Sequence, residues 1–289
     1  MERRSLRTSA RGRGARPSSC GRARLSRHPF LQMADVASRS ATRCFSSSAN
    51  SPLTEIRDPA TFAVLVHTPP RACGPLPLLL YLHGAGESGT RLWDIISEGA
   101  TGTPPVELHF GRALPALAQH FCVVAPQTAS GWPAERVQAF VRFLLSADSP
   151  LPCHIDRRRC YVTGHSMGGS GALGAGATGC FAAVAPVAAG GMRGPWSGLC
   201  GVPVWLFHGA NDAVLPVSCS EGAAAALKAL NGEVLVRFTR YQTAPDPPGY
   251  PHATGHASTI PAYATEELYH WLLSHSKPET TVETTSSTS

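Results

Sequence analysis

The chain has 289 residues, of which 43% are hydrophobic, and a formal net charge of +6. This length and apolar content suit one globular domain with a sizeable core. No apolar run approaches the ~18 residues of a membrane span, which argues against a transmembrane segment.

The positive charge is concentrated at the N-terminus. Residues 1–45 hold 11 Arg, no Lys and only two acidic residues, together with many Ser and Ala. This composition, without an apolar core, is typical of an organellar transit peptide and not of a secretory signal. The sequence Arg43-Cys44-Phe45-Ser46 resembles a mitochondrial processing site, so we expect the mitochondrial matrix, with a plastid as the alternative. Without this segment the formal charge is −3, so the basic residues do not indicate a nucleic-acid partner.

Apolar runs and helical patterns alternate along the rest of the chain. Strands are expected at residues 62–66, 78–82, 121–125, 160–163, 182–187, 204–207 and 234–238, and helices at 114–120, 134–147, 167–178, 219–231 and 263–274. This alternation predicts an α/β fold with a doubly wound, mostly parallel sheet and helices on both faces. We assign residues 46–60 to a linker, 61–276 to the domain, and 277–289 to a disordered tail.

A glycine-rich loop follows the strand expected at 78–82. It reads His83-Gly84-Ala85-Gly86-Glu87-Ser88-Gly89. Backbone amides in such a loop can approach a substrate oxygen closely, and Ala85, with Gly86 beside it, is the expected donor. We interpret His83 as structural, together with His165 and His208, which also stand next to strand ends.

A serine in a G-x-S-x-G frame follows the strand at 160–163. The run is Gly164-His165-Ser166-Met167-Gly168-Gly169. A strand that turns sharply into a helix at a serine needs glycines on both sides, because a Cβ there would collide with backbone. The pattern predicts a nucleophile elbow that holds Ser166 Oγ at the C-terminal edge of the sheet. The amide of Met167, at the N-terminus of the next helix, would form the other half of an oxyanion hole.

An acid and a base follow this serine in the chain. A serine hydroxyl becomes a good nucleophile when a base takes its proton and a carboxylate orients that base. Asp212 comes just after the strand at 204–207, and the loop after the last strand holds His252 and His256. The order serine, aspartate, histidine is that of α/β-hydrolases. We assign His256 as the base because the following helix anchors it, and His252 stays open as the alternative.

Four strings of this chain resemble a known family. YLHGAGESG, YVTGHSMGG, VPVWLFHGANDAVLP and GHASTIPAYATEELYHWLLSH are similar to the carboxylesterase/phospholipase branch of the α/β-hydrolase superfamily, near predicted esterases related to polyhydroxybutyrate depolymerases and feruloyl esterases. The resemblance implies that Ser166 is the nucleophile, Asp212 the orienting acid and His256 the base. It also implies that the amides of Ala85 and Met167 bind the oxyanion. The loop at 241–255 is longer than is common in that family.

These observations predict a serine hydrolase that cleaves carboxylic ester or thioester bonds through an acyl-enzyme. The substrate would be a small-molecule ester, and no cofactor is expected. A peptidase of the same fold and a non-catalytic binding module on this scaffold are the alternatives. Residues 190–201 are too few for a lid, so we expect an open site in which Trp132 and Trp196 form walls for an apolar group. The sequence gives no indication of oligomeric state.

The cysteines and histidines do not indicate a metal site or disulfides. Two of the nine cysteines lie in the leader, and the other seven form no C-x-x-C pair. Several occur in apolar runs, where a reduced thiol behaves as a small buried hydrophobe. His252 and His256 are four residues apart, but Pro251 and Gly255 exclude a helix that would bring them together on one metal.

Overall fold

The structure is a computed structural model that describes residues 51–58, 61–70, 74–191 and 195–279. The predicted transit peptide and most of the predicted tail lie outside the described residues.

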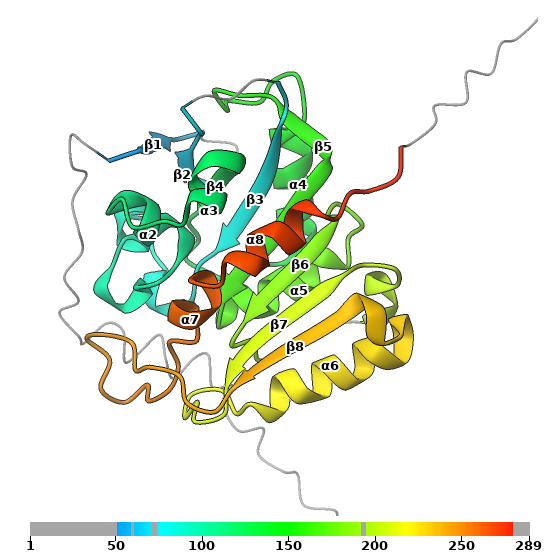
Figure 1. Cartoon of the computed structure of the whole chain (residues 1–289). Helices are drawn as coiled ribbons and strands as arrows, with labels where there is room; N and C mark the ends of the chain where they lie inside the picture. The colour runs from blue at the N-terminus through cyan, green and yellow to red at the C-terminus, as the bar shows by residue number, and fades with distance from the viewer. Residues whose placement is uncertain (1–50, 59–60, 71–73, 192–194, 280–289) are drawn as a thin grey trace, which may run out of the picture.

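An eight-stranded sheet forms the centre of the domain (Figure 1). Only β1 with β2 and β2 with β4 pair antiparallel, and the other neighbours are parallel. The predicted doubly wound, mostly parallel sheet is therefore confirmed. In spatial order the strands are β1 (Leu53–Ile56), β2 (Val64–His67), β4 (Cys122–Pro126), β3 (Leu76–Leu82), β5 (Ile155–His165), β6 (Ala183–Val187), β7 (Val204–Gly209) and β8 (Val236–Tyr241).

Helices cover both faces of this sheet and create two apolar cores. One core is formed with α4 (Ala134–Leu144), α5 (Met167–Gly176) and α6 (Ser218–Asn231). The other is formed with α2 (Pro104–His109), α3 (Pro115–His120), α7 (Thr259–Tyr263) and α8 (Glu266–Leu273). Figure 1 shows α7 and α8 in front of the sheet and α4 and α5 behind it. Because both faces are covered, β3, β4, β6 and β7 are buried along their whole length, as their apolar sequences predict.

The domain extends beyond the predicted bounds at both ends. Leu53–Ile56, which we placed in the linker, forms β1 and pairs with β2. At the other end, the backbone N–H of Lys277 donates to the carbonyl of Arg158 at 2.9 Å, and the Lys277 ammonium donates to the carbonyl of Gly179. Residues before 61 and after 276 therefore form hydrogen bonds with the folded domain, which extends beyond the predicted bounds.

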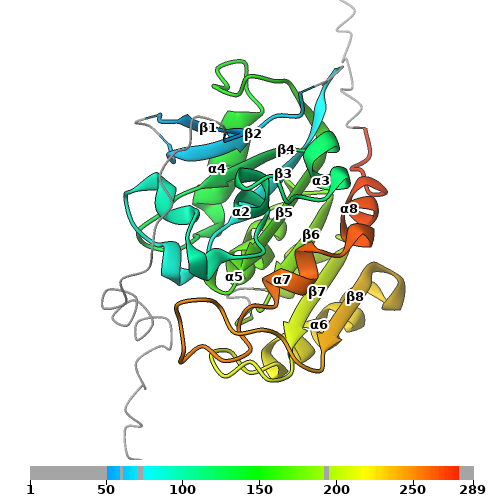
Figure 2. The ribbon, with the colours of Figure 1, turned by 60° about the vertical axis from the view of Figure 1, so that its left-hand side comes forward.

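The parallel strands direct three loops to one edge of the sheet. The loops that follow β3, β5 and β7 leave from the carboxyl ends of their strands, where ligands bind in sheets of this kind. The long segment between β8 and α7, orange in Figures 1 and 2, lies beyond the same strand ends in both views. Among the described helices, none combines the length and apolar character that a membrane crossing requires.

Candidate active site

Ser166 occupies the tight turn between β5 and α5. Its backbone has φ 56° and ψ −113°, a region that costs a non-glycine residue ~1–3 kcal/mol. Its N–H donates to the carbonyl of Val187 at the end of β6, at 2.9 Å. A Cβ on Gly168 would lie 1.8 Å from the carbonyl oxygen of Leu82, and one on Gly164 would lie 2.5 Å from that of Gly168. The steric reason for the glycines in the G-x-S-x-G frame is therefore present in the structure.

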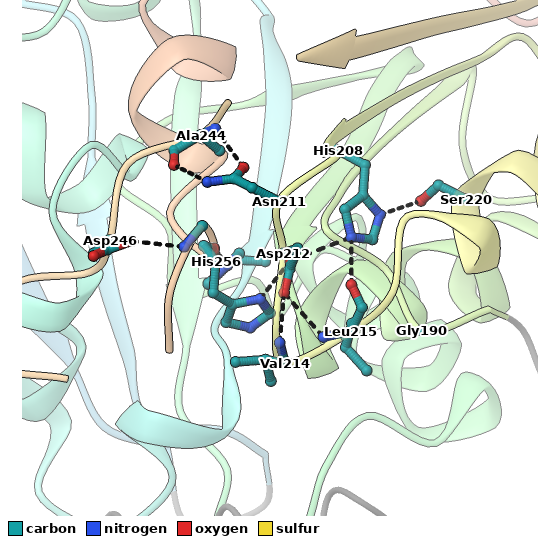
Figure 3. Close-up of polar contacts among 12 residues, drawn as sticks. Gly190, His208, Asn211, Asp212, Val214, Leu215, Ser220, Ala244, Asp246 and His256 are labelled. Carbon is teal, nitrogen blue, oxygen red and sulfur yellow. Dashed lines mark hydrogen bonds and ion pairs between the residues drawn. The ribbon is translucent and has the colours of Figure 1, made fainter. Parts of the chain in front are cut away.

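Asp212 follows β7 and is the centre of a network of hydrogen bonds (Figure 3). Its Oδ1 accepts the N–H groups of Val214 and Leu215, both at 2.9 Å. Its Oδ2 lies 2.7 Å from His256 Nδ1 and 3.2 Å from His208 Nε2. Burial opposes ionisation, but the hydrogen bonds from the two histidines hold the pKa of Asp212 well below its usual range. The carboxylate is consequently charged at neutral pH.

His256 presents a free acceptor nitrogen to the pocket that contains Ser166. Because Nδ1 faces the Asp212 carboxylate, it carries the hydrogen, which leaves Nε2 able to accept a proton. Among the described residues, His256 Nε2 and Ser166 Oγ are both buried without a hydrogen-bond partner, and both residues line the same pocket. The structure thus brings Ser166, Asp212 and His256 together, whereas His252 is exposed on the same loop.

His208 contacts the same oxygen of the Asp212 carboxylate as His256 does. Its Nε2 also lies 2.9 Å from the carbonyl of Leu215, and its Nδ1 lies 2.7 Å from Ser220 Oγ. Since Nε2 faces two oxygens, it carries the hydrogen and donates to both. The sequence indicated a structural histidine at this position, and the contact adds that His208 helps to orient Asp212.

The two other strand-end histidines support the backbone of the site. His165 Nε2 donates to the carbonyl of His256 at 2.8 Å, and burial lowers the pKa of His165 to about 3. His83 Nδ1 lies 2.7 Å from the carbonyl of Gly84, and its Nε2 accepts the N–H of Thr128 at 3.1 Å. Burial lowers the pKa of His83 to about 4. Both rings are neutral at physiological pH, as structural histidines would be.

The expected oxyanion donors begin two helical turns. Ala85 and Gly86 open the short 3-10 helix η1 (Ala85–Glu87), and Met167 opens α5. Amides in the first turn of a helix have no acceptor inside that helix, so they can bind an oxygen outside it. Ala85 and Gly86 line the pocket with Ser166, while the Met167 side chain packs against the core.

Glu87 is a buried carboxyl in this pocket that the sequence did not single out. It is 5% exposed and lines the pocket with Ser166 and His256. Burial raises the pKa of Glu87 to about 7, although hydrogen bonds from the amides of Gly84 and of Glu87 itself favour the charged form. The glutamate in the glycine-rich loop was the only signal for it in the sequence.

Neither predicted tryptophan lines the pocket. Trp132 is 8% exposed, and its Nε1 donates to the carbonyl of His83 at 2.9 Å, so it belongs to the core beneath the loop. Trp196 begins the 3-10 helix η4 (Trp196–Leu199). A Cβ on Gly198 of this helix would lie 2.7 Å from Ala177, so η4 packs just after the C-terminal end of α5, whereas Ser166 precedes its N-terminal end. The structure therefore does not place these two side chains in the pocket that contains Ser166, where we expected them to form walls.

The pocket is also more enclosed than expected. Ser166 is 2% exposed and His256 3%. Although no insertion lies between β6 and β7, the loop between β8 and α7 covers the site with Pro247, Tyr250 and Ala253, and the remaining volume is about 40 Å³. A larger cavity, of about 510 Å³, lies among α2, α7 and α8 and contains neither Ser166 nor His256.

In the part of the chain that the structure describes, no group of three or more His, Cys, Asp or Glu residues could hold a metal ion. The cysteines in the same part are free thiols, with Cys122 and Cys160 buried.

Comparisons with known proteins agree with this fold. The sequence model of a family described as PET hydrolase-like (PETase) matches residues 116–226, which include Ser166 and Asp212. A search of curated proteins gave no match. Among solved structures, a thermostable esterase is similar, with 28% identity and a TM-score of 0.63 over 78% of this chain, which spans 62% of that protein's length. A protein from Klebsiella pneumoniae assigned as a dienelactone hydrolase has 18% identity and a TM-score of 0.52, over 73% of this chain and 92% of its own.

Proposed function

Because this chain belongs to the α/β-hydrolase superfamily, we propose that it is a serine hydrolase that cleaves carboxylic ester bonds. One observation carries the proposal. His256 Nδ1 is hydrogen-bonded to Asp212 at 2.7 Å, while its Nε2 and Ser166 Oγ stand unpartnered in one pocket of the described structure. The similarity to a thermostable esterase supports the ester bond as the target.

The reaction would proceed through an acyl-enzyme. Ser166 Oγ attacks the ester carbonyl as its proton passes to His256 Nε2, and the negative Asp212 stabilises the imidazolium that forms. The carbonyl oxygen becomes an oxyanion, which the amides of Ala85 or Gly86 and of Met167 bind. The tetrahedral intermediate then collapses, and the alcohol leaves with the proton from His256. Water attacks the acyl-enzyme by the same steps in reverse, which releases the acid and restores the serine.

Labelling with a fluorophosphonate probe, followed by an ester panel, tests this proposal. Ser166→Ala exchanges one small residue for another, so it should keep the fold, lose the label and lower kcat by ~10³-fold or more. Ser197→Ala is the matched control, because Ser197 is exposed in η4 at the far end of α5. Wild-type turnover in the Ser166→Ala variant would contradict the proposal, and a preference for acyl-thiol substrates would identify a thioesterase.

The mitochondrial matrix is the compartment that we propose for this enzyme. The proposal rests on the 11 Arg and the two acidic residues of residues 1–45, a cationic composition suited to import across an energised inner membrane.

A further inference from the structure

The loop that carries His256 is fixed to the rest of the site at several points. The Asn211 side chain binds both backbone groups of Ala244, with Nδ2 donating at 2.9 Å and Oδ1 accepting at 2.7 Å. Within the loop, Asp246 Oδ1 accepts the N–H of Gly255 at 2.7 Å (Figure 3), and Pro245 accepts the N–H of Ala257 at 3.0 Å. These bonds give the loop a defined shape over the pocket.

Tyr250 extends from this loop onto two glycines in other segments. A Cβ on Gly99, in the 3-10 helix η3 (Glu98–Ala100), would lie 2.1 Å from Tyr250 Cε2. A Cβ on Gly86, one of the expected oxyanion donors, would lie 3.1 Å from Tyr250 Oη. The ring therefore fills space that a side chain at Gly99 would occupy, and its hydroxyl lies in close contact with Gly86.

This ring is the largest group in the wall of the pocket. Five other lining residues are small, namely Gly84, Ala85, Gly86, Gly99 and Ala253. The volume that remains, about 40 Å³, is far below the ~300–1,000 Å³ of pockets that enclose drug-sized ligands. The Tyr250 ring thus forms the part of this wall that lies next to Gly86, one of the expected oxyanion donors.

We propose that Tyr250 is a specificity-determining residue that restricts this site to esters with a small group on at least one side of the carbonyl. The inference rests on the proposed function, because it concerns the substrate of the same serine. The ring acts by occupying volume next to Gly86 and Gly99. A larger substituent would have to displace it from this slot, and in an apolar pocket a single methylene changes kcat/KM by about 10–200-fold.

The test compares two series of esters: p-nitrophenyl esters with acyl chains of two to ten carbons, and acetate esters of graded alcohols. The wild type should show kcat/KM falling steeply with length in at least one series. Tyr250→Ala should raise the ratio of long-chain to short-chain kcat/KM in that series by at least about 10-fold. Tyr250→Phe keeps the ring, so it should keep the wild-type length profile.

A second variant, at Gly99, tests the space that the Tyr250 ring occupies by changing the residue that the ring packs against. Gly99→Ala places a Cβ where the Tyr250 ring now lies, so the ring must leave its slot and the profile should shift in the same direction. If the Tyr250→Ala variant fails to fold, Gly99→Ala still tests whether the position of the Tyr250 ring sets the length profile. Thr243→Ala, at an exposed position on the same loop, is the control and should not change the profile.

The outcomes separate this inference from the proposed function. Fluorophosphonate labelling of Ser166 with length profiles that stay within twofold of wild type in Tyr250→Ala and Gly99→Ala would overturn the role of Tyr250 alone. A wild type that hydrolyses long and short esters equally would overturn it as well. Absence of both labelling and ester turnover in the folded wild-type protein would instead refute the serine hydrolase, and this inference with it.

Discussion

Replacing Glu87 with glutamine should make the stability of the domain less dependent on pH. The Glu87 carboxyl is 5% exposed, and burial raises its pKa from the ordinary 4.5 to about 7. Glutamine has nearly the same size and stays neutral at every pH, so the substitution removes the titration and keeps most of the packing.

The sign of the effect follows from proton binding in the two states. Between pH 4.5 and 7 the folded protein retains a proton at Glu87 that the unfolded chain has released. The free energy of unfolding therefore decreases as the pH rises through this window, and the cost is absent below it. At ~1.36 kcal/mol per pKa unit, the full cost above pH 7 is about 3 kcal/mol.

Urea denaturation of both proteins at pH 5, 6, 7 and 8, followed by tryptophan fluorescence, measures this cost. The difference in unfolding free energy, variant minus wild type, should increase by up to about 3 kcal/mol from pH 5 to pH 8. If the glutamine amide changes the unfolding free energy by the same amount at every pH, this pH dependence is not affected. The titrations of His83 and His165 occur in both proteins and cancel.

The matched control is Glu135→Gln, because Glu135 is an exposed glutamate at the start of α4. A Glu87→Gln difference that is the same at pH 5 and pH 8 would refute the reasoning. It would mean that the Glu87 carboxyl either ionises without cost inside the fold or is already solvated there.

His256→Ala should lower kcat as far as the serine variant does, and the double variant should lower it little further, because the two residues act as a unit; loss of turnover in His252→Ala instead would assign the base to His252. Gly168→Ala should destabilise the domain by more than the ~1–3 kcal/mol usual for overpacking, because its Cβ would meet backbone at 1.8 Å. In the same urea assay Gly222→Ala, in an open helical position, should cost nothing, and equal values for the two would contradict the steric account. A fusion of residues 1–45 to a fluorescent reporter should enter mitochondria, and a diffuse cytosolic signal would count against the leader.

The elements that local sequence determines were predictable. The buried strands appear as apolar runs, and the elbow at Ser166 appears as the G-x-S-x-G pattern after one of them, although the contact that requires Gly168 comes from Leu82 in another strand. Two of the elements that were missed have local reasons. Leu53–Ile56 is a short edge strand with two exposed residues, and α2 begins with Pro104-Pro105, which suggests a loop although proline is well tolerated in the first helical turn.

The features missed at the site depend on contacts between distant segments. A tryptophan near a glycine-rich loop has the same sequence signature whether it lines a pocket or, like Trp132, donates to a buried carbonyl. Whether the site is covered depends on how far the loop before α7 folds back over it. The two glycines that Tyr250 contacts, Gly86 and Gly99, lie about 150 residues earlier in the chain. For His208, only the fold shows that its ring meets Asp212, because that contact needs the turn after β7 to reverse direction.

The loop before α7 has a consequence for attempts to redesign this protein. The same segment covers the pocket and positions His256, whose backbone N–H donates to the carbonyl of Ala253, and it is held beside Asp212 through Asn211. Shortening or grafting this loop to admit bulkier compounds would shift the imidazole as well, and a misplacement of ~1 Å can cost ~10²-fold in rate. Point changes at Tyr250 or Gly99 leave those anchors in place, so they are the better starting positions for a library that aims at new substrates without losing turnover.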